Sequence, residues 1–173
     1  MSTLVILTHP NMTRSQVNRK WRDALLDDGI DVHELYHTYP DGVIDVKAEQ
    51  SLLERYDTII FQYPMYWYSS PSLLKQYLDE VFLYGWAYGS TGNALKGKQF
   101  GLAVSIGGEA DHYNSETHTR YTPETLLTPM LATFDFIGAK YIGLHKLHGA
   151  ANIDSEQLKT NTAEYLSFIH NAK

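Results

Sequence analysis

The sequence predicts an α/β fold with a doubly wound, five-stranded parallel sheet in the order 2-1-3-4-5. Five short apolar runs alternate with five longer segments of helical periodicity, which is the pattern of a parallel sheet covered by helices. The runs at 4–8, 58–63 and 100–105 are almost continuously apolar, as strands buried on both faces are. The chain has 173 residues and no internal repeat, so we expect one domain over 1–173.

The first half of the chain supplies three strands and two helices. After the strand at 4–8, a helix begins at Ser15, carries Trp21 in its apolar stripe and ends near Gly29, a residue suited to the left-handed cap. The run at 31–36 is more polar and predicts a strand nearer the sheet edge. A short helix at 46–55 and the strand at 58–63, stopped by Pro64, follow.

The second half repeats the alternation. The helix at 72–82 has a complete i, i+3, i+4, i+7, i+8 apolar stripe. The strand at 100–105 precedes a helix at 123–136 that starts with a favourable proline. A strand at 139–145 and a helix at 155–171 close the chain, and we expect the histidine-containing runs 34–37 and 145–148 to be solvated strand ends.

Composition excludes several classes of function. The net charge is -6, so the overall field does not attract a phosphate backbone and no nucleic-acid partner is expected. There is no cysteine, and His112 and His118 lack a short ligand spacing and an accompanying carboxylate cluster, so no metal is expected. No run approaches the roughly 20 apolar residues of a membrane span, and the start lacks a signal sequence. A cytoplasmic location is therefore expected.

In this strand order a ligand crevice forms at the carboxyl ends of strands one and three. The loop at 8–18 opens onto a helix N-terminus, whose free N–H groups suit a phosphate. Ser15 adds a hydroxyl donor, and His9 and Arg14 add candidate cations. A plain helix cap at Ser15 is the alternative interpretation.

The loop at 63–71 is the most informative segment. It holds four aromatic residues, a methionine and two prolines, whereas solvent-exposed loops are normally polar. Prolines at both ends stiffen the loop and hold its N–H groups. An apolar wall with fixed donors is what a flat heterocycle requires. The alternative is a loop covered by another element or subunit.

The loop at 105–113 follows another buried strand. Gly107 and Gly108 allow the backbone to approach a ligand closely. Tyr113 adds a hydroxyl that can donate to developing negative charge. The glycine pair is also compatible with a simple turn.

These loops carry a resemblance to a known family. The segments 61–75, 84–88, 95–98 and 106–109 resemble the NAD(P)H:quinone oxidoreductase family with the flavodoxin-like fold. Within it, the chain is similar to short bacterial members, which include general-stress NAD(P)H oxidoreductases and ancillary reductases of glutathione-gated potassium efflux systems. The resemblance covers nearly the whole chain in order.

The resemblance implies a bound FMN or FAD, a homodimer with active sites at the subunit interface, and hydride transfer from NAD(P)H to a quinone-like acceptor. FMN is favoured because the chain lacks the C-terminal extension of FAD-binding relatives. The implied flavin-binding residues are His9, Ser15, Gln16 and Val17 at the phosphate end, Pro64, Met65, Tyr66, Trp67 and Tyr68 along the ring, and Ser105, Gly107, Gly108 and Tyr113 at its pyrimidine edge.

The implied catalytic groups are the Gly108 backbone and the Tyr113 hydroxyl, which both face the part of the flavin where negative charge develops during reduction. Relatives carry a histidine proton partner a few residues beyond the tyrosine; His118 is one position short of that spacing. Trp67, Tyr113 and Trp86 are candidates for an aromatic slot that admits flat acceptors.

Two other functions stay open at this point. The chain could be a regulatory subunit of a potassium efflux system, or a one-electron flavodoxin. The second alternative lacks its usual Ser/Thr-Gly-rich phosphate loop here.

Overall fold

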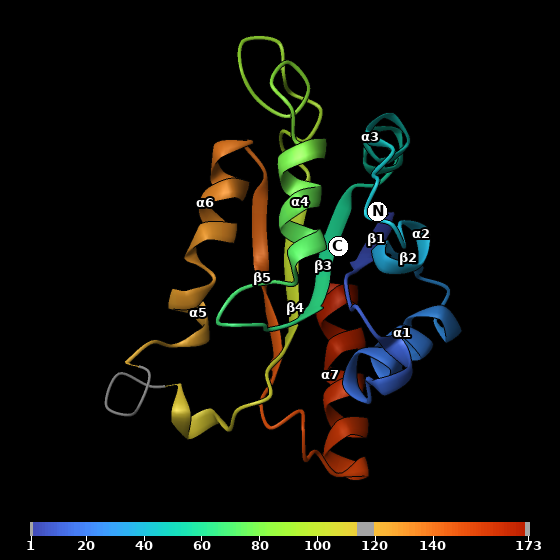
Figure 1. Ribbon diagram of the computed structural model, residues 1–173, viewed down its shortest axis with the longest axis vertical. Coiled ribbons are helices and arrows are strands. Elements are labelled where there is room, and N and C mark those ends of the chain that lie inside the picture. Colours follow the sequence, from blue (N-terminus) through green and yellow to red (C-terminus); the bar gives the residue numbers. More distant parts are fainter. Residues whose placement is uncertain (1, 114–119, 172–173) are drawn as a thin grey trace.

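A five-stranded, all-parallel sheet forms the centre of the protein (Figure 1). The computed structural model describes residues 2–113 and 120–171. The strands are β1 (Thr3–Leu7), β2 (Asp31–Glu34), β3 (Thr58–Pro64), β4 (Gln99–Ser105) and β5 (Lys140–Leu147). Their order is β2-β1-β3-β4-β5, which confirms the predicted topology. β3 is buried along its whole length, consistent with its nearly continuous apolar sequence.

Helices cover both faces of this sheet (Figure 1). They are α1 (Val17–Asp27), α2 (Leu35–Thr38), α3 (Val46–Glu54), α4 (Ser72–Val81), α5 (Pro123–Leu126), α6 (Thr128–Phe136) and α7 (Ser155–Asn171). On one face, Trp21 of α1 and Tyr165 of α7 pack against Ile60 of β3. On the other, Tyr77 of α4 and Phe134 of α6 belong to a larger core cluster. The hydrophobic effect thus fixes two layers of helix around one sheet.

Two predicted elements differ from the structure. β2 ends at Glu34 rather than at 36, because the next residues form the helical turn α2 with Leu35 buried. The helix expected at 123–136 is broken into α5 and α6, since Pro129 has no N–H for the Thr125 carbonyl. The Thr128 hydroxyl donates to that carbonyl instead, at 2.7 Å.

The histidine-containing strand ends are also not solvated as expected. His145 is buried and its ring stacks on Tyr165, with the centroids 4.8 Å apart. Leu147, two residues further along β5, is buried as well. The strand therefore continues into the core at the point where sequence analysis expected it to emerge.

A buried carboxylate fixes α4 against its neighbours. Glu49 Oε1 accepts hydrogen bonds from the His33 ring (2.8 Å) and the Tyr39 hydroxyl (2.5 Å), and Oε2 accepts one from Tyr77 (3.0 Å). Burial opposes ionisation of Glu49, but these donors together hold its pKa below the ordinary value. Tyr77 lies on α4, so the cluster anchors the helix that follows the 65–71 loop.

Because all five strands are parallel, the loops that leave their carboxyl ends meet at one edge of the sheet (lower end in Figure 1). The long connection between α4 and β4 lies at the opposite end. None of the described helices has the length and apolar character needed to cross a membrane.

Candidate functional site

Backbone hydrogen bonds join the loops at the carboxyl edge to one another. The Met65 N–H donates to the Ser105 carbonyl and the Ile106 N–H donates to the Leu147 carbonyl, each at 2.8 Å. The Gly149 N–H donates to the Gly108 carbonyl at 3.0 Å. The segments that follow β3, β4 and β5 are therefore held as one surface rather than as independent loops.

The loop after β3 contains a tight, strained turn. Tyr66 and Ser69 exchange two backbone hydrogen bonds of 2.9 Å, and the two residues between them have positive φ angles, 48° at Trp67 and 62° at Tyr68. Turns of this kind normally use asparagine or glycine, since a side chain at positive φ is strained by about 1–3 kcal/mol. Here the two positions carry large aromatic rings, and Trp67 is 92% exposed. Strain of this kind is typical of functional sites.

The turn also presents donors. Within the described part of the chain, the backbone N–H groups of Trp67 and Tyr68 form no hydrogen bond. The turn holds them in fixed positions because its two flanking residues are bonded to each other. This agrees with the predicted rigid aromatic loop with free N–H groups.

The loop after β1 is organised around Asn11. Its side-chain oxygen accepts hydrogen bonds from the Thr13 hydroxyl (2.7 Å) and the Arg14 N–H (3.3 Å), and its own N–H donates to His9 Nδ1 (3.0 Å). Burial lowers the pKa of His9. With Nδ1 occupied as an acceptor, the neutral ring carries its proton on Nε2. His9 is thus a hydrogen-bond donor rather than the cation considered from the sequence.

The N-terminus of α1 lies next to this loop. The Ser15 hydroxyl oxygen accepts the Asn18 N–H at 3.1 Å, which is a cap-type bond. The backbone N–H groups of Gln16 and Val17 donate to no other described residue. These two groups and the helix dipole favour an anion at this point.

The loop after β4 brings a glycine pair under a tyrosine ring. A Cβ atom on Gly108 would lie 3.0 Å from Tyr113 Cε2, so the ring rests directly on the glycine, whereas a Cβ on Gly107 would meet no atom within 4 Å. The Tyr113 ring lies 6.4 Å from that of Tyr68 and 5.4 Å from that of His148, between centroids. Burial, and to a lesser degree Tyr68, raises the pKa of Tyr113, so the hydroxyl stays protonated and can donate.

Comparison with known proteins identifies the family. A family model described as the flavodoxin-like fold matches residues 1–169. The chain belongs to this family. The resemblance indicated by the sequence motifs is thereby confirmed.

Individual relatives of this flavodoxin-like chain cover almost its full length. General stress protein 14 of Bacillus subtilis (strain 168) is 47% identical over 170 residues, which span 96% of this chain and 97% of the relative. The crystal structure of general stress protein 14 from Treponema denticola in complex with FMN is 41% identical, with a TM-score of 0.94 and full coverage of both chains. An NADPH-quinone reductase from P. pentosaceus is 29% identical, with a TM-score of 0.88 and 97% coverage of each chain.

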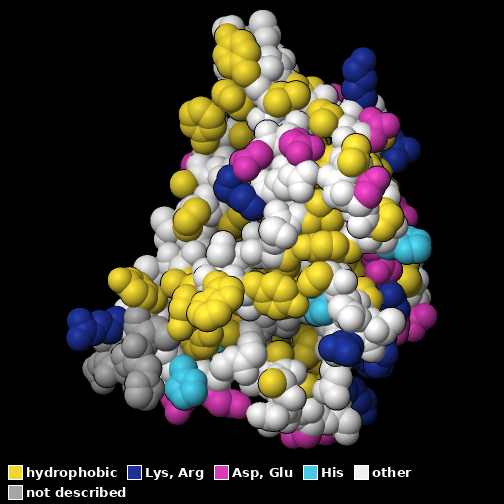
Figure 2. Space-filling model, viewed as in Figure 1, with side chains coloured by type: hydrophobic (Ala, Val, Ile, Leu, Met, Phe, Trp, Pro, Cys, Tyr) yellow, Lys and Arg dark blue, Asp and Glu magenta, His cyan; other side chains and the backbone are white. Residues whose placement is uncertain are grey.

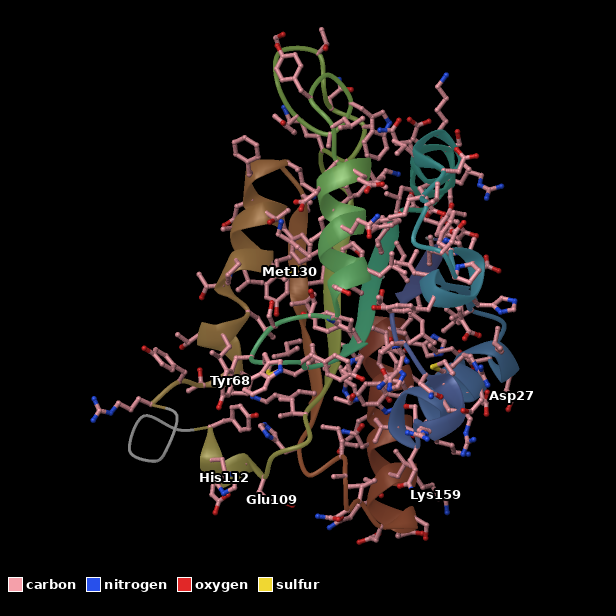
Figure 3. All side chains as sticks on the ribbon, viewed as in Figure 1. Asp27, Tyr68, Glu109, His112, Met130 and Lys159 are labelled. Carbon is pink, nitrogen blue, oxygen red and sulfur yellow. The ribbon has the colours of Figure 1, made fainter. Side chains whose placement is uncertain are left out.

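The predicted site residues of this flavodoxin-like chain gather at the carboxyl edge, with two exceptions. Figure 3 shows Tyr68 and Glu109 near this end of the molecule, on the loops that follow β3 and β4. Trp86 does not join them: its indole N–H donates to Glu54 at the C-terminal end of α3 (2.7 Å), at the other end of the sheet. The second exception, His118, lies outside the described residues.

Two features of the edge were missed by sequence reasoning. His148 lies against Tyr113, and its buried Nδ1 has no hydrogen-bond partner. Burial lowers its pKa, and the Lys146 ammonium lowers it further. The other feature is a buried chain of side-chain hydrogen bonds below the loops, which includes Asn18 and Gln62. Their contacts join residues far apart in sequence, so no local pattern reveals them.

A hollow of about 380 Å³ adjoins the same edge on the β2 side. It is lined by Leu7, His9, Pro10, Met12, Arg22, Glu34, Tyr36 and His37. The loop after β1 forms one wall of this hollow, and the aromatic turn is not among its lining residues. Among the described residues, no three histidine, aspartate or glutamate side chains are grouped to hold a metal ion.

The strained turn yields a testable prediction. We expect Trp67→Asn combined with Tyr68→Gly to raise the free energy of unfolding by about 1 kcal/mol, because residues suited to positive φ relieve the strain. This gain exceeds the lost Tyr68–Tyr113 ring contact. Urea unfolding at equilibrium measures the change. Trp67→Ala with Tyr68→Ala is the matched control, since it removes both rings and keeps the strain. Equal stability of the two double variants would contradict the strain assignment.

Proposed function

We propose that the chain is an FMN-dependent NAD(P)H oxidoreductase that reduces flat, quinone-like acceptors. The observation that carries this proposal is the Tyr66–Ser69 turn, which combines two exposed aromatic rings with two unpaired N–H groups at fixed positions. The turn lies at the same sheet edge as the α1 N-terminus and Tyr113. The FMN complex of the Treponema denticola relative, 41% identical over the full chain, supports the choice of cofactor.

The residues present fit a flavin mononucleotide. The N–H groups of Gln16 and Val17 and the hydroxyl of Ser15 suit the phosphate, and His9 adds a neutral donor. Pro64, Met65 and the aromatic turn provide the apolar bed for the ring. Two buried atoms near this edge, Thr8 Oγ1 and His148 Nδ1, lack hydrogen-bond partners, as expected where a ligand contributes to the site.

When bound, FMN would accept hydride from NAD(P)H and deliver it to the acceptor. The protein's part is to orient both substrates and to stabilise negative charge. The N–H groups of Gly107 and Gly108 donate to no other described residue, and the protonated Tyr113 hydroxyl lies beside them. These donors are preorganised for the ring edge at which charge accumulates during reduction. NAD(P)H and the acceptor would then use the same exposed face in turn.

We also propose that the active form is a homodimer. Hydrophobic side chains gather on the face shown in Figure 2. The large apolar side chains exposed in the described part of the chain include Trp67, Leu83, Tyr84, Tyr121 and Phe136. Where such side chains form a patch, they typically mark a protein–protein interface. A second copy of this chain would cover it and close the aromatic slot. Association with a membrane potassium-efflux protein stays a prediction.

The proposed function predicts a spectroscopic result. The purified chain with FMN should show a flavin band that NADPH or NADH bleaches without oxygen, and a quinone such as menadione should restore it. Stopped-flow absorbance at the flavin maximum measures both half-reactions. Free FMN with the same reductant is the control. Binding without bleaching by either nucleotide would contradict the enzyme and favour a one-electron carrier.

A second prediction concerns Tyr113. Tyr113→Phe keeps the ring on Gly108 but removes the donor, so we expect FMN to remain bound while reduction by NAD(P)H slows roughly 100-fold. Single-turnover kinetics measure this rate. Tyr56→Phe is the matched control, because that hydroxyl bonds to Asp31 far from the site at 2.9 Å. An unchanged reduction rate in Tyr113→Phe would exclude the role given to the hydroxyl.

A further inference from the structure

A buried chain of side-chain hydrogen bonds runs directly beneath the candidate site. It starts at Tyr165 on α7, passes through Gln62 on β3 and Asn18 on α1, and ends at two serines, Ser105 and Ser15. All five residues are buried. Buried polar groups in a low dielectric must pair each donor with an acceptor. The direction of one hydrogen bond in the series therefore determines the direction of the next.

One backbone carbonyl determines which atoms donate and which accept along this series of hydrogen bonds. Gln62 bonds to the Asn18 carbonyl at 3.1 Å, and since a carbonyl can only accept, the Gln62 atom there is Nε2. Gln62 Oε1 then faces Tyr165, whose hydroxyl is the donor at 3.2 Å. Gln62 Nε2 also lies 3.4 Å from Asn18 Oδ1, so the oxygen of the Asn18 amide faces Gln62.

Asn18 consequently turns its side-chain donor toward Ser105, and its backbone N–H separately points to Ser15. Its Nδ2 donates to Ser105 Oγ at 2.8 Å, and its backbone N–H donates to Ser15 Oγ at 3.1 Å. A hydroxyl that accepts such a bond still holds its own proton. Neither serine donates that proton to any other residue that the structure describes. Both protons therefore lack an acceptor within the described part of the chain.

We propose that Asn18 is a positioning residue whose side chain fixes Ser105 as a hydrogen-bond donor toward the bound ligand, while its backbone N–H occupies Ser15 as a helix cap does. The site then selects a molecule with an acceptor atom at each position: a phosphate oxygen at Ser15 and a pyrimidine-ring acceptor at Ser105. This inference rests on the proposed FMN function and specifies which hydroxyls determine the fit. Ser105 contacts the ligand, whereas Asn18 acts through it.

Asn18→Asp tests the proposal because it reverses the direction of the hydrogen bond between residue 18 and Ser105 and hardly changes the shape of the side chain. The substitution replaces the Nδ2 donor with an acceptor, so Ser105 would donate to the introduced carboxylate instead of to the ligand. We expect the Kd for FMN, measured by flavin fluorescence quenching, to rise about tenfold, which corresponds to the loss of one hydrogen bond. Ser105→Ala should cause a similar rise in the wild-type background and no further rise in the Asn18→Asp background.

A spectroscopic signature separates this role from a structural one. In infrared difference spectra, a carbonyl band of bound FMN should move to higher frequency by the same amount in Asn18→Asp and in Ser105→Ala. Asn161→Asp is the matched control. That amide also donates through Nδ2, to the Lys146 carbonyl at 3.2 Å, and it accepts from Trp21 at 3.1 Å, away from the site. It should lower stability and leave both the FMN Kd and the band unchanged.

Each outcome decides the inference. If Asn18→Asp does not fold, Asn18→Ser removes the same donor without a buried charge and must still couple to Ser105→Ala. Additive effects of the two substitutions, or a wild-type Kd in Asn18→Asp, would overturn the inference while leaving the proposed function intact. Failure of the wild-type chain to bind FMN would overturn the proposed function itself.

Discussion

The Asn18 side chain and backbone hold together the three segments on which the candidate site depends. They connect the N-terminus of α1 to β3 through Gln62 and to the end of β4 through Ser105. Replacing Asn18 by an apolar residue would leave buried donors and acceptors unpaired, each costing about 1–3 kcal/mol. The loops after β1, β3 and β4 therefore have a common polar foundation, and their relative positions are determined before any ligand arrives.

On this foundation the protein maintains a turn that local preferences oppose. Trp67 and Tyr68 adopt left-handed backbone angles that their side chains disfavour, while Tyr66 and Ser69 close the turn through two hydrogen bonds. The anchoring of α4 through Glu49 and Tyr77 keeps the helix that follows in place. A strained but well-held segment with exposed rings is typical of a binding site rather than of a segment that adds stability.

Much of this architecture could be predicted from the sequence because its determinants are local. The continuous apolar runs and the helical stripes predict the five strands and the helices between them, and the order 2-1-3-4-5 that is common for such a pattern places the functional edge. Pro129 splits the helix expected at 123–136, and a proline inside a helical pattern is itself a local signal for such a break. The composition of the loop at 63–71 indicates its apolar, aromatic character, whereas the positive φ angles of Trp67 and Tyr68 have no signal in the sequence.

Other features depend on contacts that join distant parts of the chain. The burial of His145 results from its stacking on Tyr165 of α7, and no periodicity within β5 indicates it. The Asn18–Ser105 hydrogen bond spans 87 positions. The residue type of Trp86 suggests a place in the aromatic slot. However, the segment between α4 and β4 that contains Trp86 lies at the opposite end of the sheet, where the indole N–H donates to Glu54.

The central claim is that the carboxyl edge, from the α1 N-terminus to the Tyr66–Ser69 turn, is a flavin site. A crystal structure of the chain with FMN tests it most directly. We expect density for the phosphate against Gln16 and Val17 and for the ring against Trp67 and Tyr68. Density for the ring in the hollow beside Arg22, Glu34 and Tyr36, or at the opposite end of the sheet, would contradict it.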